Sequence, residues 1–172
     1  MKKIALLLSI MLSTCNIVCA QGIFDNLFGG GVKKEISSNV EEAYQSFIGI
    51  SEMGSPEQIM RQNNFAFLCE IGNMPQSYGS ACFLKANGSY NHADTAEYYL
   101  EKAVIKAAKS NNDKLTKDLS EVKQFAQKIK EYANLARNTP NLEKFNDYMD
   151  EVLRLTRNAT KSVRTLRITH KL

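Results

Sequence analysis

The sequence predicts a mainly α protein, an elongated helical bundle with a long antiparallel helical hairpin at its C-terminal end. Apolar residues recur at alternating steps of four and three through residues 115–166, which is the spacing that keeps one apolar seam against a partner helix. Only three prolines and nine glycines occur among 172 residues, so long segments lack helix breakers. Helical segments do not alternate with strand patterns, which excludes a βαβ protein.

The composition is that of an ordinary globular domain. Hydrophobic residues make up 44% of the chain and charged residues 23%. These values exclude a disordered polyelectrolyte, a collagen-like fibre and a membrane protein with several spans. The length is that of one domain with short appendages.

The first 20 residues have the layout of a secretory signal peptide. Lys2 and Lys3 precede an apolar run over residues 4–12, and Val18 and Ala20 supply the residues before a cleavage point. We therefore expect residues 1–20 to be removed and the mature chain to be exported from a bacterial cytoplasm, to the periplasm, the cell surface or the medium. The alternative is a lipoprotein anchored through Cys15, although the threonine before that cysteine departs from the usual pattern.

Residues 21–34 are expected to form a flexible segment ahead of a single helical domain at 35–172. The segment ends in a run of glycines and two lysines, and chain termini are often loose. It also contains a small apolar cluster that is a candidate docking segment for a partner or a membrane: Ile23, Phe24, Leu27 and Phe28.

Three helices are expected before the hairpin. A capping box at residues 38–41 predicts the start of the first helix, and Gly54 its end. Ser55 and Pro56 are a strong start for a second helix that reaches about residue 72. Residues 73–91 contain Pro75 and two glycines and are expected to be irregular, with the third helix beginning at Asp94 and stopping near residues 110–112.

The hairpin is the clearest pattern. Its arms are expected at residues 115–136 and 142–166, and the proline-containing break at 138–141 makes them antiparallel neighbours. The predicted seam consists of Leu115, Leu119, Val122, Ala126, Ile129, Ala133 and Ala136 in the first arm, and Leu142, Phe145, Met149, Val152, Thr156, Ala159, Val163 and Leu166 in the second.

Two cysteines remain after the signal peptide is removed, Cys69 and Cys82. An even number of cysteines in an exported chain favours a disulfide. The bridge would close a short loop and contribute about 3 kcal/mol of stability through loop-closure entropy. Two buried thiols are the alternative.

Candidates for catalysis are few, and we expect no enzymatic activity, no metal and no cofactor. A serine nucleophile motif is absent, and no cysteine and histidine cluster has the spacing of a zinc site. The histidines do not lie in a recognisable catalytic context: His92 is expected in a loop before a helix, and His170 as a solvated cation near a helix end.

A basic stretch at the C-terminus is the most suggestive surface feature, because residues 154–172 contain no acidic residue. Four of its cations follow helical spacing and are expected on one face of the last helix: Arg154, Arg157, Lys161 and Arg164. This face is a candidate contact for an anionic partner such as lipid head groups, glycans or an acidic protein. The alternative is favourable placement of cations at a helix C-terminus. Nucleic acid is not expected, since the chain is exported and the basic residues are not interleaved with aromatic ones.

The residues at the predicted cleavage point carry a family resemblance. An exported bacterial chain that reads Ala20, Gln21, Gly22 and Ile23, followed by helices and a long helical hairpin, resembles the minor pilus subunits of type IV secretion systems. Those subunits sit at the pilus tip and help to contact target cells. The resemblance implies a helical fold and protein partners within a secretion apparatus, and assigns no role to individual residues.

These patterns together favour an exported, non-enzymatic interaction protein of a secretion apparatus or cell surface, with protein partners and the capacity to form oligomers. An alternative is a periplasmic inhibitor or immunity-type protein that inserts its bridged loop into another protein. A small secreted hydrolase is the third class, and it has no motif in its favour.

Overall fold

The computed structural model describes residues 30–53 and 81–172. Within these ranges the chain forms four helices and no strand: α2 (Gly30–Glu52), α5 (Ala81–Lys109), α6 (Asp113–Asn138) and α7 (Leu142–His170). The predicted mainly α class is therefore confirmed. The chain divides into two units, Met1–Glu35 and Ile36–Leu172, so α2 crosses the boundary between them. The second unit contains the helical bundle.

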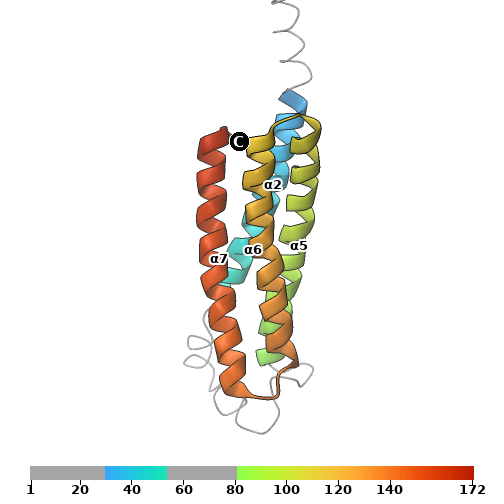
Figure 1. Ribbon diagram of the computed structural model, residues 1–172. Helices are drawn as coiled ribbons and strands as arrows, with labels where there is room; N and C mark the ends of the chain where they lie inside the picture. Colours follow the sequence, from blue (N-terminus) through green and yellow to red (C-terminus); the bar gives the residue numbers. More distant parts are fainter. Residues whose placement is uncertain (1–29, 54–80) are drawn as a thin grey trace, which may run out of the picture. The chain divides into compact units, whose positions relative to one another are not determined.

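Within the second unit, each helix runs antiparallel to its neighbours (Figure 1). Lys123 of α6 pairs with Glu101 of α5, whereas Lys130, further along α6, pairs with Asp94, which is earlier in α5. α2 and α7 are also antiparallel. Glu41 pairs with Arg167, whereas Tyr44, further along α2, pairs with Arg164, which is earlier in α7. The four helices thus close an up-down-up-down bundle, with α6 packed against both α5 and α7.

The predicted hairpin is α6 followed by α7, and its seam is confirmed almost residue by residue. All seven predicted positions of the first arm are buried in α6. In the second arm Leu155 is buried in addition to the predicted set, and Leu142 is only half-buried. Asparagines begin both helices: the side chain of Asn112 accepts a hydrogen bond from the Leu115 amide, and that of Asn141 from the Lys144 amide.

The predicted start of the first helix was wrong. The capping box at residues 38–41 lies inside α2, which begins at Gly30 and includes the part of the expected flexible segment from residue 30 to 34. Ile36 is buried and lies four residues before buried Val40, so the apolar row extends one turn further back than the capping box. Burial of this row stabilises the helix beyond a local capping preference. The second predicted helix, at residues 55–72, lies outside the described residues.

The predicted irregular stretch was also wrong for residues 81–91, which form the first turns of α5 rather than a loop. The irregular stretch was predicted partly because Gly88 is usually a helix breaker. A Cβ at Gly88 would lie 2.9 Å from the sulfur of Met53, and one at Gly49 would lie 2.7 Å from the ring of His92. The two glycines therefore permit α2 and α5 to approach closely, and His92 lies in a helix rather than in a loop.

Small side chains dominate the interior of the bundle. Alanines of all four helices are completely buried and are mixed with large residues such as Phe47, Leu100 and Phe145. Alanine rows allow helix axes to approach, and the large side chains fill the remaining space at the density of a protein interior. The completely buried alanines are Ala43, Ala86, Ala93, Ala96, Ala103, Ala107, Ala126, Ala133, Ala136 and Ala159.

A charge in the hairpin seam is expected to unfold the bundle. Leu119 and Val152 are fully buried, so Leu119→Asp or Val152→Asp would place an unpaired carboxylate in an apolar interior and cost more than about 3 kcal/mol. The measurement is urea denaturation followed by circular dichroism. Lys117→Asp, at an exposed position two residues from Leu119, is the control and should leave the midpoint nearly unchanged. Unaltered midpoints in both seam variants would refute the assignment of this seam.

Candidate interaction surface

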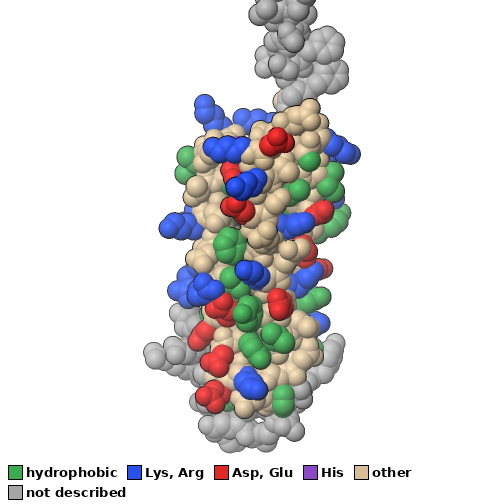
Figure 2. Space-filling model, viewed as in Figure 1, with side chains coloured by type: hydrophobic (Ala, Val, Ile, Leu, Met, Phe, Trp, Pro, Cys, Tyr) green, Lys and Arg blue, Asp and Glu red, His purple; other side chains and the backbone are tan. Residues whose placement is uncertain are grey.

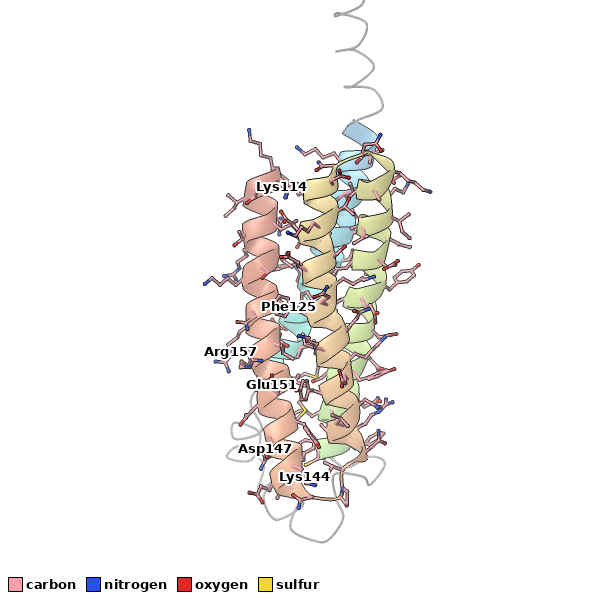
Figure 3. All side chains as sticks on the ribbon, viewed as in Figure 1. Lys114, Phe125, Lys144, Asp147, Glu151 and Arg157 are labelled. Carbon is pink, nitrogen blue, oxygen red and sulfur yellow. The ribbon has the colours of Figure 1, made fainter. Side chains whose placement is uncertain are left out.

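The charges of α7 are separated along the helix. Its first ten residues contain Glu143, Asp147, Asp150 and Glu151, whereas no acidic residue follows Glu151. Figure 2 shows acidic side chains gathered over the lower part of α7 and basic side chains over its upper part, and Figure 3 labels Asp147, Glu151 and Arg157 in that order along the helix. This order complements the helix dipole, with anions near the N-terminus and cations near the C-terminus.

The four predicted basic residues all lie exposed on α7, but they do not act as one set. Arg154 binds Glu151 through its Nε, 2.7 Å from Oε2. Arg164 donates from Nε to the hydroxyl of Tyr44 on α2, at 3.0 Å. Arg157 donates to the carbonyl of Leu153 in its own helix, and Lys161 borders a groove. Three of the four side chains therefore make contacts within the bundle, and the contact of Arg164 joins two helices.

The groove lies between the upper halves of α6 and α7 and has a volume of about 460 Å³. Buried Val122 and Leu166 form its floor. The half-buried ring of Phe125 projects from α6 on the side that faces α7 (Figure 3). The groove exists because the residues opposite Phe125 on α7 are small and polar, among them Ser162 and Thr165. Its size is within the range of roughly 300 to 1,000 Å³ that is usual for ligand sites.

The two walls of this groove carry opposite charges. Glu121 and Asp118 lie on α6, and Lys161 lies on α7. The Nε2 of His170 is 2.7 Å from Oδ2 of Asp118, which ties the end of α7 to α6. Neither Glu121 nor Lys161 forms any of the ion pairs found among the described residues. The groove thus presents an aromatic ring together with an acidic and a basic side chain.

A row of ion pairs between α5 and α6 was not predicted from the sequence. Lys130 binds both Asp94 and Glu97, Lys123 binds Glu101, and Gln127 donates to Glu97 at 2.8 Å. Burial raises the pKa of Glu97, but the hydrogen bonds from Lys130 and Gln127 outweigh it and the net direction is downward. The acidic residues of α5 recur at helical spacing opposite the cations of α6, and this pairing shows only once the antiparallel register is known.

Polar residues are buried at the end of the bundle where α5 begins. Cys82 and Ser89 are completely buried, and Lys85, between them, is 6% exposed. Burial lowers the pKa of Lys85 from 10.5 to about 8, while attraction to Cys82 and Asp150 acts in the opposite direction. The Oγ of Ser89 and the Oδ1 of Asn146 are buried without a hydrogen-bond partner among the described residues. The spacing of residues in the sequence does not predict that these polar side chains are buried together.

Several predicted features fall outside the described residues: the signal peptide, the docking segment at Ile23, Phe24, Leu27 and Phe28, and Cys69. The bridge between Cys69 and Cys82 therefore stays a prediction, to which the structure adds that Cys82 lies buried in the first turn of α5. None of the described helices is both long and apolar enough to span a bilayer.

The candidates for chemistry are not brought together in the described part of the chain. The ring of His92 lies against Gly49 of α2. His170, expected as a solvated cation, is instead largely buried beside Asp118, with 10% of its side chain exposed. Residues 30–53 and 81–172 contain no group of three or more histidine, cysteine or acidic side chains that is placed to hold a metal ion.

No protein-family model, curated protein or solved structure matches this chain.

Replacing Lys85 is expected to stabilise the protein at neutral pH. The pKa of Lys85 is lower in the folded protein than in the unfolded chain, so below pH 8 the folded state carries a poorly solvated charge. Lys85→Met should raise the free energy of unfolding by about 1–3 kcal/mol at pH 7. As pH rises from about 8 to 10.5 the wild-type lysine loses its proton first in the folded state, and the difference should vanish.

The measurement is urea denaturation of both proteins at pH 7, 9 and 10.5. Lys109→Met, at an exposed position on the same helix, is the control and should show no such convergence. A Lys85→Met protein that is less stable than wild type at pH 7 would contradict a lysine held at a depressed pKa.

Proposed function

We propose that this chain is an exported, non-enzymatic interaction protein of a bacterial secretion apparatus or cell surface, similar in role to the minor pilus subunits of type IV secretion systems. The observation that carries the proposal is the groove between α6 and α7, which Phe125, Glu121 and Lys161 line together and in which neither charged residue forms one of the ion pairs of the described residues. Half-buried aromatic side chains flanked by charges are typical of protein interfaces.

An open groove between two antiparallel helices suits an elongated protein segment better than an enclosed small molecule. A helix or extended segment from a partner would place an apolar side chain against Phe125, a cation toward Glu121 and an anion toward Lys161. Such helix-in-groove binding uses a small number of apolar anchors and obtains its specificity from the surrounding charges. The bundle provides a rigid frame, because the groove floor is also part of the hairpin seam.

The test is photocrosslinking in the cells that make the protein. A photoreactive phenylalanine analogue at position 125 is expected to crosslink to another subunit of an envelope assembly, identified by mass spectrometry. The same analogue at position 131, exposed on α6 outside the groove, is the control and should give no such product. A crosslink from position 125 to a toxin or hydrolase would instead support the inhibitor class, and equal labelling from both positions would overturn the groove as the binding site.

Charge variants separate the groove from the wider basic face. Lys161→Glu is expected to reduce the crosslinked product from position 125 several-fold, while Arg157→Glu, an exposed cation of α7 outside the groove, should leave it unchanged. An equal loss in both variants would indicate that a general anionic surface, rather than the groove, recognises the partner. Circular dichroism of both variants establishes that the bundle is intact.

A further inference from the structure

The outer face of α5 carries three exposed apolar residues and one asparagine in a single line. Leu84, Tyr98 and Ile105 are 58%, 56% and 43% exposed, and they are three of the five exposed large hydrophobic residues in the described part of the chain. Positions 84, 91, 98 and 105 are each separated by seven residues, and Asn91, also exposed, fills the remaining one. A seven-residue repeat keeps these side chains in one line along the helix.

The bundle does not need this row for its own interior. The opposite side of α5 is already buried by a second apolar series: Ala86, Ala93, Ala96, Leu100, Ala103 and Ala107. A helix that buries one face within its own bundle and repeats apolar residues on the other has a second seam available for another helix.

The charges beside the row are largely compensated within the molecule. On the side toward α6, Asp94 lies 3.0 Å from Lys130 and Glu101 is bound by Lys123. On the other side, the ammonium group of Lys102 lies 4.2 Å from the centre of the Tyr98 ring. The acidic residues flanking the row are therefore already neutralised, which lowers the cost of covering it with another helix.

We propose that this row is a dimer seam, in which α5 of one molecule packs antiparallel against α5 of a second copy. The four positions are arranged symmetrically about the middle of the row, near residues 94 and 95. A two-fold axis at that level places Leu84 against Ile105 of the other copy, and Asn91 against Tyr98 of the other copy. Apolar residues then meet apolar residues, and the amide of Asn91 meets the phenol of Tyr98, as an isologous interface requires.

Charge favours the antiparallel orientation over the parallel one. Lys102, Lys106 and Lys109 all lie in the second half of α5, whereas Asp94 lies near its middle. In a parallel pair, each of these lysines would lie next to the same lysine of the other molecule, and the two helix dipoles would point in the same direction. The antiparallel pair separates the lysine-rich halves and opposes the dipoles, so repulsion is avoided.

The seam is short, which sets the strength of the association. The twenty-two residues of helix from Leu84 to Ile105 span about 32 Å. One helix face of this length is at the small end of specific interfaces, so the dimer should be weak and reversible. The seam lies on a different helix from the groove, and this inference does not depend on the proposed function.

Sedimentation of the mature protein over a concentration series tests the seam. The average mass is expected to rise from that of a monomer toward that of a dimer between about 10 μM and 1 mM. Tyr98→Glu and Ile105→Glu should each weaken the association at least about tenfold, because they place a carboxylate in the seam. Leu135→Glu, at an exposed apolar position on α6, is the matched control and should associate like wild type.

A cysteine pair tests the orientation. Mixing a Leu84→Cys protein with an Ile105→Cys protein under mild oxidation is expected to give a disulfide-linked dimer, whereas either variant alone should give no more than wild type treated in the same way. A wild-type protein that stays monomeric throughout the concentration series would overturn the proposal. Linkage of Leu84→Cys to itself as efficient as to Ile105→Cys would overturn the antiparallel register.

Discussion

Close approach between helices is the constraint on which the rest of the structure depends. Ten alanines are completely buried among the described residues, and two glycines of α2 and α5 leave no room for a Cβ. These small residues hold the helices close together. The large apolar side chains must therefore fit the limited volume that remains between the helices. The antiparallel register and the groove depend on that packing.

The register then determines which polar groups meet. Asp94, Glu97 and Glu101 lie opposite the cations of α6, and Tyr44 receives a hydrogen bond from Arg164. Where α7 presents small side chains toward Phe125, the same register leaves a groove rather than a filled seam. The proposed binding groove therefore lies where the packing that joins α6 and α7 does not extend to the surface.

The sequence predicted the hairpin well because its apolar spacing and its proline break indicate the same structure. The sequence-based prediction was wrong where a contact between helices, or burial of an apolar residue, outweighs a local preference. Gly88 reads as a breaker but permits contact with Met53, and the capping box at residues 38–41 is overridden by the burial of Ile36. The basic residues of α7 were predicted correctly as exposed, but their partners could not be, since Tyr44 and Arg164 are distant in sequence. The groove and the buried Lys85 likewise depend on contacts between helices that periodicity does not specify.

The most direct test of the account is the unfolding free energy of Ala126→Leu. Leucine has a high helix propensity, so a loosely packed bundle would gain or keep stability, whereas a bundle held together by small buried residues has no space for the larger side chain. We predict a loss of about 1–3 kcal/mol relative to wild type in urea denaturation, and no loss for Gln124→Leu at an exposed position two residues away. Equal or higher stability of Ala126→Leu would contradict close helix packing as the basis of this structure.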